Sequence, residues 1–152
     1  MIVAERGATI TVRLRGWAMT TGMEGFAAGA KALSGRADGL RAAVDSGQLV
    51  MDPEAAERVA KVYEDKADDV RNMISHASRL VVAGIYGDCN IGRGLEQKFN
   101  DKVTGGSGGP GLATILRDME EILRNMSQAY RDSGRATQSD DEEQARQLGR
   151  SV

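Results

Sequence analysis

The feature that most constrains the fold is a short turn, Ile85–Gly92, between two long segments of amphipathic, helix-forming sequence. Helix-forming residues run almost without interruption from Pro53 to Val82, and a second apolar stripe begins at Ile91. The turn itself is rich in glycine, aspartate and asparagine, the residue types that end helices and reverse the chain. The pattern therefore predicts an antiparallel helical hairpin.

The first arm of this hairpin, Pro53–Val82, has the strongest helical pattern in the chain. Asp52-Pro53-Glu54 supplies an N-cap acceptor, a proline at the first helical position and a carboxylate near the positive end of the helix dipole. Apolar residues then recur at spacings of 3 and 4 over about four heptads. The second arm, Ile91–Tyr130, is interrupted by Gly105–Gly111, a predicted flexible loop that either kinks one long helix or separates two packed ones.

The large apolar residues of both arms form a predicted seam, which serves as the core of the chain or as its interface with a partner. Burying each large side chain contributes roughly 1.5–3 kcal/mol, so a few central ones can dominate the affinity. The seam consists of Val59, Val62, Tyr63, Val70, Ile74, Leu80, Leu95, Phe99, Leu116, Met119, Leu123 and Met126.

A further helix is expected over Thr20–Asp45, where apolar residues again recur at helical spacing. Its interior glycines each cost about 1 kcal/mol relative to alanine, so the helix is weak unless it is docked. It completes a three-helix bundle within the chain, or else another protomer covers the hairpin's apolar surface. The sequence thus predicts an all-α fold, with a helical-bundle domain over residues 19–136.

The two ends of the chain differ from this domain. Residues 1–18 alternate apolar and charged side chains in a β-like period, and we expect a disordered leader, or a natural start at Met19 or Met23. Charged residues interrupt this segment, so we expect no secretory signal peptide in it. Residues 137–152 form an acidic tail that has little to bury and is expected to be disordered or loosely helical.

Composition argues against several classes of function. The 20 basic and 22 acidic residues are interleaved, whereas nucleic-acid binding and polybasic membrane anchoring require a concentrated basic face. No apolar run approaches the roughly 20 residues of a membrane-spanning helix. The single cysteine and single histidine exclude an internal disulfide and a Cys/His metal site.

Two features that resemble enzyme sites are weak. Gly105–Gly111 lacks the preceding strand and the terminal Lys-Ser/Thr of nucleotide-binding loops, so a linker is the better interpretation. Cys89 lies in a turn near a helix start, where a thiolate is stabilised, but nothing in the sequence orients His76 as its base. We therefore expect a non-enzymatic interaction protein without cofactor or metal.

The residues Tyr86-Gly87-Asp88, followed by Gly92 and Phe99, resemble the turn of an actinobacterial branch of the WXG-type proteins. These are small helical-hairpin substrates and partners of type VII (ESX) secretion, and the resemblance spans roughly residues 49–134. The chain has no Trp-x-Gly at its turn. The resemblance implies a homodimer or heterodimer with another helical hairpin, contact with the secretion machinery, and a protein that is cytoplasmic before export by a route that needs no signal peptide.

The export signal of that family is Tyr-x-x-x-Asp/Glu just after the second helix. Tyr130 is suitably placed, but the residue four positions on is Gly134, and Asp132 is the nearest acid. On a helix, a residue two positions along points to a different side. Tyr130 and Asp132 are thus a remnant of the signal, and the chain travels with a partner or is not exported. The alternative is a cytoplasmic helical adaptor or regulatory subunit unrelated to secretion.

Overall fold

The structure, a computed structural model, describes residues 20–150. The predicted leader, residues 1–18, lies outside the described residues. The elements are α1 (Thr20–Asp45), α2 (Pro53–Ser78), α3 (Asn90–Thr104) and α4 (Leu112–Gly149). Over residues 20–150 no strand forms beyond one isolated bridge, so the prediction of an all-α fold is confirmed.

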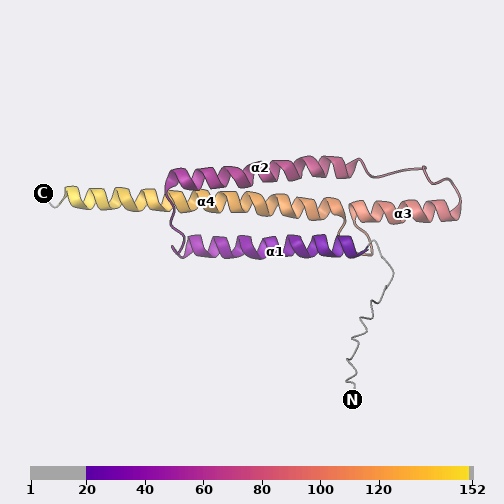
Figure 1. Cartoon of the computed structure of the whole chain (residues 1–152), viewed down its shortest axis with the longest axis horizontal. Coiled ribbons are helices and arrows are strands. Elements are labelled where there is room, and N and C mark those ends of the chain that lie inside the picture. Colours follow the sequence, from indigo (N-terminus) through magenta and orange to yellow (C-terminus); the bar gives the residue numbers. More distant parts are fainter. Residues whose placement is uncertain (1–19, 151–152) are drawn as a thin grey trace, which may run out of the picture.

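Helix α4 is the centre of an elongated bundle, with α2 along one side and α1 along another (Figure 1). α2 runs antiparallel to α4, as the hairpin pattern predicts, and α1 runs parallel to it. α1 and α2 do not pack against each other. α3 continues the line of α4 past the ends of the other helices, and the C-terminal end of α4 projects at the opposite end of the molecule (Figure 1).

The start of α2 follows the sequence signal closely. The side chain of Asp52 accepts a hydrogen bond from the Ala55 backbone N–H at 2.9 Å, and Pro53 is the first helical residue. Such a cap satisfies one of the backbone donors that a helix start leaves unpaired.

The core lies between α2 and α4. Five buried residues form its centre, and partly buried side chains of α1, α2 and α4 pack around them. The α1 side chains are Phe26 and Leu33, so the weak N-terminal helix is docked within the chain. The central residues are Ala67, Val70, Ala77, Leu116 and Leu123.

The segment Gly105–Gly111 separates two helices that run in the same direction. Gly106 and Gly109 exchange two backbone hydrogen bonds, of 3.2 and 3.0 Å, so the segment is a tight ordered turn. A side chain at Gly111 would fall against the backbone of Val103, Thr104 and Gly105, which explains the need for glycine there.

α4 extends to Gly149, over most of the segment for which the sequence predicts a disordered or loosely helical tail. Residues 138–149 of this helix are exposed, because neither α1 nor α2 reaches that far (Figure 1). Its side-chain contacts are local, such as the ion pair of Arg146 with Glu142 at 3.8 Å.

Candidate interaction surfaces

The turn motif builds the connection from α2 to α3. α2 ends at Ser78, four residues before the predicted Val82, and residues 79–89 form the connection. Gly87 has a φ of 79°, a backbone conformation that favours glycine. Gly92 is buried because the chain folds back over it: an added Cβ would fall against the carbonyl oxygen of Tyr86 and 2.6 Å from that of Gly87. Asp88 is exposed.

Asn100 of α3 holds this connection, and its role is not evident from the sequence. Its side-chain amide donates to the Val82 carbonyl at 2.8 Å and accepts from the Val82 N–H at 2.9 Å. Glu96 accepts from the Gly84 N–H at 2.7 Å. The extended backbone thus uses α3 side chains as hydrogen-bond partners, which explains why the helix of α2 ends early.

One face of α3 remains uncovered by the described chain. Ile91, Leu95 and Phe99 follow each other at four-residue spacing and are 84%, 50% and 38% exposed. In the neighbouring connection, Ile85 is also exposed. Large apolar side chains gathered in this way are typical of a binding surface.

The predicted seam divides into a covered and an uncovered part. Val70, Leu116, Leu123 and Met126 are buried, and Val59, Tyr63, Ile74 and Met119 are partly buried. Val62, Leu80, Leu95 and Phe99 are exposed, so they do not belong to the core of the chain. Their part in an interface stays a prediction.

Small buried residues also lie along α2 and α4, and they are not among the predicted seam residues. The buried alanines of α2 follow each other at 4, 7 and 10 residues, which keeps them on one side of the helix, and this spacing was a usable signal. Small side chains let two helix backbones approach closely, and here Gly134 faces the first turn of α2. The buried small residues are Ala56, Ala60, Ala67 and Ala77 of α2 and Ala113, Ser127, Ala129, Ser133 and Gly134 of α4.

A row of ion pairs lies along one edge of the α2–α4 contact. Arg131 contacts Glu57 at 3.0 Å and Glu64 at 2.7 Å, and Arg124 contacts Asp68 at 2.8 Å. These hydrogen bonds raise the pKa of both arginines, and the bond from Arg131 lowers the pKa of Glu57. The row favours antiparallel pairing of these two helices.

The two residues interpreted from the sequence as a remnant of an export signal lie inside α4. The ring of Tyr130 stacks on that of Tyr63 with centroids 5.4 Å apart, and burial, followed by the effect of Tyr63, raises the pKa of its hydroxyl. Asp132 contacts Arg41 of α1 at 2.7 Å. Burial opposes ionisation of Asp132, but hydrogen bonds from Gln128 and Arg41 hold the pKa of this carboxyl below its usual value. Both side chains therefore contribute to packing between helices.

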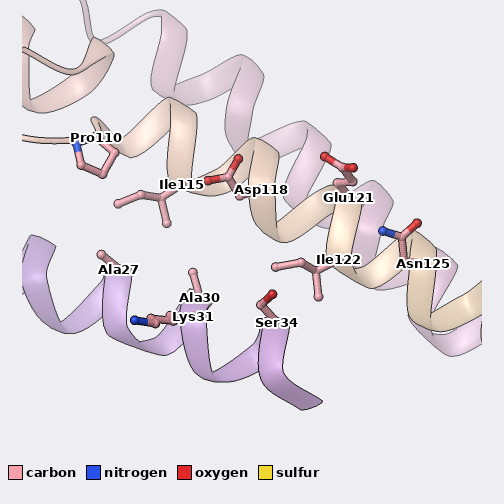
Figure 2. Close-up of a pocket in the computed structure, with 10 residues that line it drawn as sticks. All are labelled: Ala27, Ala30, Lys31, Ser34, Pro110, Ile115, Asp118, Glu121, Ile122 and Asn125. Carbon is pink, nitrogen blue, oxygen red and sulfur yellow. The ribbon is translucent and has the colours of Figure 1, made fainter. Parts of the chain in front are cut away.

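A groove runs between α1 and α4. Figure 2 shows its wall of Ala27 and Ala30 from α1, facing Ile115 and Ile122 from α4. Its volume is about 480 Å³, and it continues towards Arg41 as a second hollow of about 250 Å³. The rims are polar: Asp118, Glu121 and Asn125 lie on α4, with Lys31 and Ser34 on α1.

The side chains considered for chemistry lie on different elements. Cys89 is exposed and caps α3, its sulfur accepting a hydrogen bond from the Gly92 N–H at 3.3 Å. His76 is an exposed residue of α2. Within residues 20–150 there is no group of His, Cys, Asp and Glu that could hold a metal ion. Nor is any helix of that part of the chain long and apolar enough to cross a membrane.

Comparison of the chain with protein-family models, with curated proteins and with solved structures gives no match.

Proposed function

We propose that this chain is a non-enzymatic helical-bundle protein that acts by binding another helical protein, in the manner of a type VII secretion substrate or its partner. The observation that supports this most directly is the uncovered apolar face of α3. Three large side chains in a row face solvent there, although α1 already covers part of the bundle within the chain. A partner that covers this apolar area removes it from water, and this stabilises the complex.

The turn into α3 is consistent with the proposal. The residues that resemble the family's turn, Tyr86-Gly87-Asp88 and Gly92, form a close reversal in which glycine is sterically required. The protein is cytoplasmic when it meets its partner, and export then requires no signal peptide.

Export is tested by expressing the chain, together with its genetic neighbours, in an actinobacterial host with and without a functional type VII system. The chain is expected in the medium only when that system is intact. Export that persists without the system, or retention in the cell with every neighbour tested, contradicts the secretion proposal.

A cytoplasmic helical adaptor is the second candidate, and the position of Tyr130 favours it. Its ring is stacked on Tyr63 and is followed by further turns of helix, so it is poorly available to a receptor. Tyr130→Ala separates the two candidates. Export lost in this variant while its complex with the partner still forms supports the secretion signal, whereas unchanged retention in the cell supports the adaptor.

A further inference from the structure

We propose that the groove between α1 and α4 binds α3 of a second copy of this chain, so that two copies exchange these elements in an antiparallel dimer. The inference rests on the proposed function, because it names the partner that covers the apolar face of α3. Both surfaces belong to one chain. They cannot meet within it, because α3 projects beyond the bundle in line with α4 (Figure 1).

The two surfaces agree in length and in apolar character. α3 has 15 residues, which corresponds to about 22 Å of helix. The groove extends along α1 from Ala27 to Arg41, a distance of about 21 Å at the same rise per residue. Its floor of Ile115 and Ile122 is apolar, as is the exposed stripe of α3 (Figure 2).

The charges on the two surfaces are complementary. Lys98 and Lys102 are exposed. Since an α-helix turns by about 100° per residue, both lysines lie on the same side of the apolar stripe of α3. Asp118 and Glu121 are exposed on the α4 rim of the groove. Within residues 20–150 none of these four side chains takes part in an ion pair. Lysines and carboxylates left unpaired in one copy are therefore available to each other in two.

The same charges favour one direction of α3 in the groove. With α3 antiparallel to α4 of the second copy, the lysine flank faces the acidic rim. The reverse direction would turn it towards the α1 rim, where the two cations Lys31 and Arg41 outnumber the single carboxylate of Asp38. A two-fold axis perpendicular to the long axis of the molecule also places α3 of one copy antiparallel to α4 of the other, because α3 and α4 run in the same direction within one chain (Figure 1). Such an axis forms each contact twice.

The area of two such contacts is sufficient for a dimer. A helix about 11 Å wide and 22 Å long has about 760 Å² of lateral surface. Burying half of it removes a similar area from the groove, so two contacts bury about 1,500 Å². A standard-size protein interface buries roughly 1,600 Å².

The experiment exchanges charges between the two surfaces of the full chain. One variant has an acidic α3, Lys98→Glu with Lys102→Glu, and the other a basic groove, Asp118→Lys with Glu121→Lys. Sedimentation velocity and light scattering measure the mass of each alone and of the two mixed. We expect the unmodified chain to dimerise and each variant alone to dissociate with a Kd raised at least about 100-fold. The mixture should recover the dimer, because both of its contacts then join opposite charges.

Two further variants separate this contact from general effects. Asp140→Lys with Asp141→Lys makes the same charge change on the exposed end of α4, and should leave the dimer intact. Leu95→Asp on α3 should produce a folded monomer, whereas Val50→Asp, at a somewhat more exposed site before α2, should leave the dimer intact. Circular dichroism melts identify any variant that has lost its fold.

A monomeric unmodified chain overturns the inference, as does a dimer that survives both charge variants or a mixture that fails to associate. These results do not overturn the proposed function. If the chain is a monomer that forms a stoichiometric complex with a helical protein from its genetic neighbourhood, the proposed function stands. That protein, rather than a second copy of the chain, is then the partner.

Discussion

Gly134 provides a sharp test of how closely α2 and α4 approach. It is buried in α4, and a Cβ built on it would lie 2.8 Å from the Cβ of Ala56 and 3.1 Å from the Cα of Pro53. The Pro53 contact is with backbone at the start of α2, so it is relieved only if the two helices move apart. Gly134→Ala should therefore lose the advantage that alanine normally has in a helix.

The magnitude follows from two opposing terms. Replacing glycine by alanine inside a helix stabilises by about 1 kcal/mol, and overpacking a tight contact costs about 1–3 kcal/mol. Gly134→Ala should thus destabilise the chain by about 0–2 kcal/mol. Gly35→Ala is the matched control, because nothing lies within 4 Å of a Cβ at this position of α1, and it should stabilise by about 1 kcal/mol.

Urea denaturation followed by circular dichroism measures both variants, with the slope of each transition compared to confirm that unfolding stays two-state. The Ala56→Gly change added to Gly134→Ala removes the shorter of the two contacts. The pair should be less destabilising than the sum of the single changes. If Gly134→Ala stabilises the chain as much as Gly35→Ala does, the close approach of α2 and α4 is wrong.

Three further expectations concern the core, the connection and the ion pairs. Leu123→Asp places an unpaired charge at a site only 8% exposed, and should abolish the cooperative thermal transition; a normal melt and elution volume would contradict the core assignment. Asn100→Ala removes both hydrogen bonds to Val82, so amide hydrogen exchange at Val82 should accelerate while global stability changes little. Unchanged exchange would show that Asn100 does not hold the connection between α2 and α3. Because the pKa of Glu57 is lowered in the folded chain, its stabilising effect is present above the ordinary value of 4.5 and is lost as the pH falls below it. Urea midpoints measured against pH should therefore fall less steeply on acidification in Arg131→Gln than in the unmodified chain, and parallel curves would exclude this pair as a source of the pH dependence.

Local signals in the sequence were sufficient for α1 and for the start of α2. The Asp52-Pro53-Glu54 start and the 3–4 repeat that follows predict α2 because capping and amphipathic spacing act within a few residues. The predicted helix over Thr20–Asp45 has the same bounds as α1. The early end of α2 at Ser78 was not predictable in this way, since it depends on Asn100, 18 residues beyond Val82.

The interaction surfaces were less accessible to the same reasoning. A stripe of large apolar residues has the same spacing whether a helix of the chain or a partner covers it. Val70 and Leu95 were equally suitable members of the seam, yet α4 covers only Val70. What separates them is the position of α3 beyond the end of α2, and this position follows from the lengths of the helices and the turn at Gly105–Gly111 rather than from either residue.

The turn at Gly105–Gly111 therefore has a consequence for function. If α3 and α4 formed one unbroken helix, the directions of the α3 side chains would be fixed by those of α4. The turn removes that constraint and fixes α3 in an independent orientation, with Gly111 packed against the backbone of Val103. Asn100 and Glu96 then place the connection from α2 on one side of α3, and this leaves Ile91, Leu95 and Phe99 on the open side. The uncovered face is thus the result of an ordered turn and specific hydrogen bonds, as expected of a surface that binds a partner.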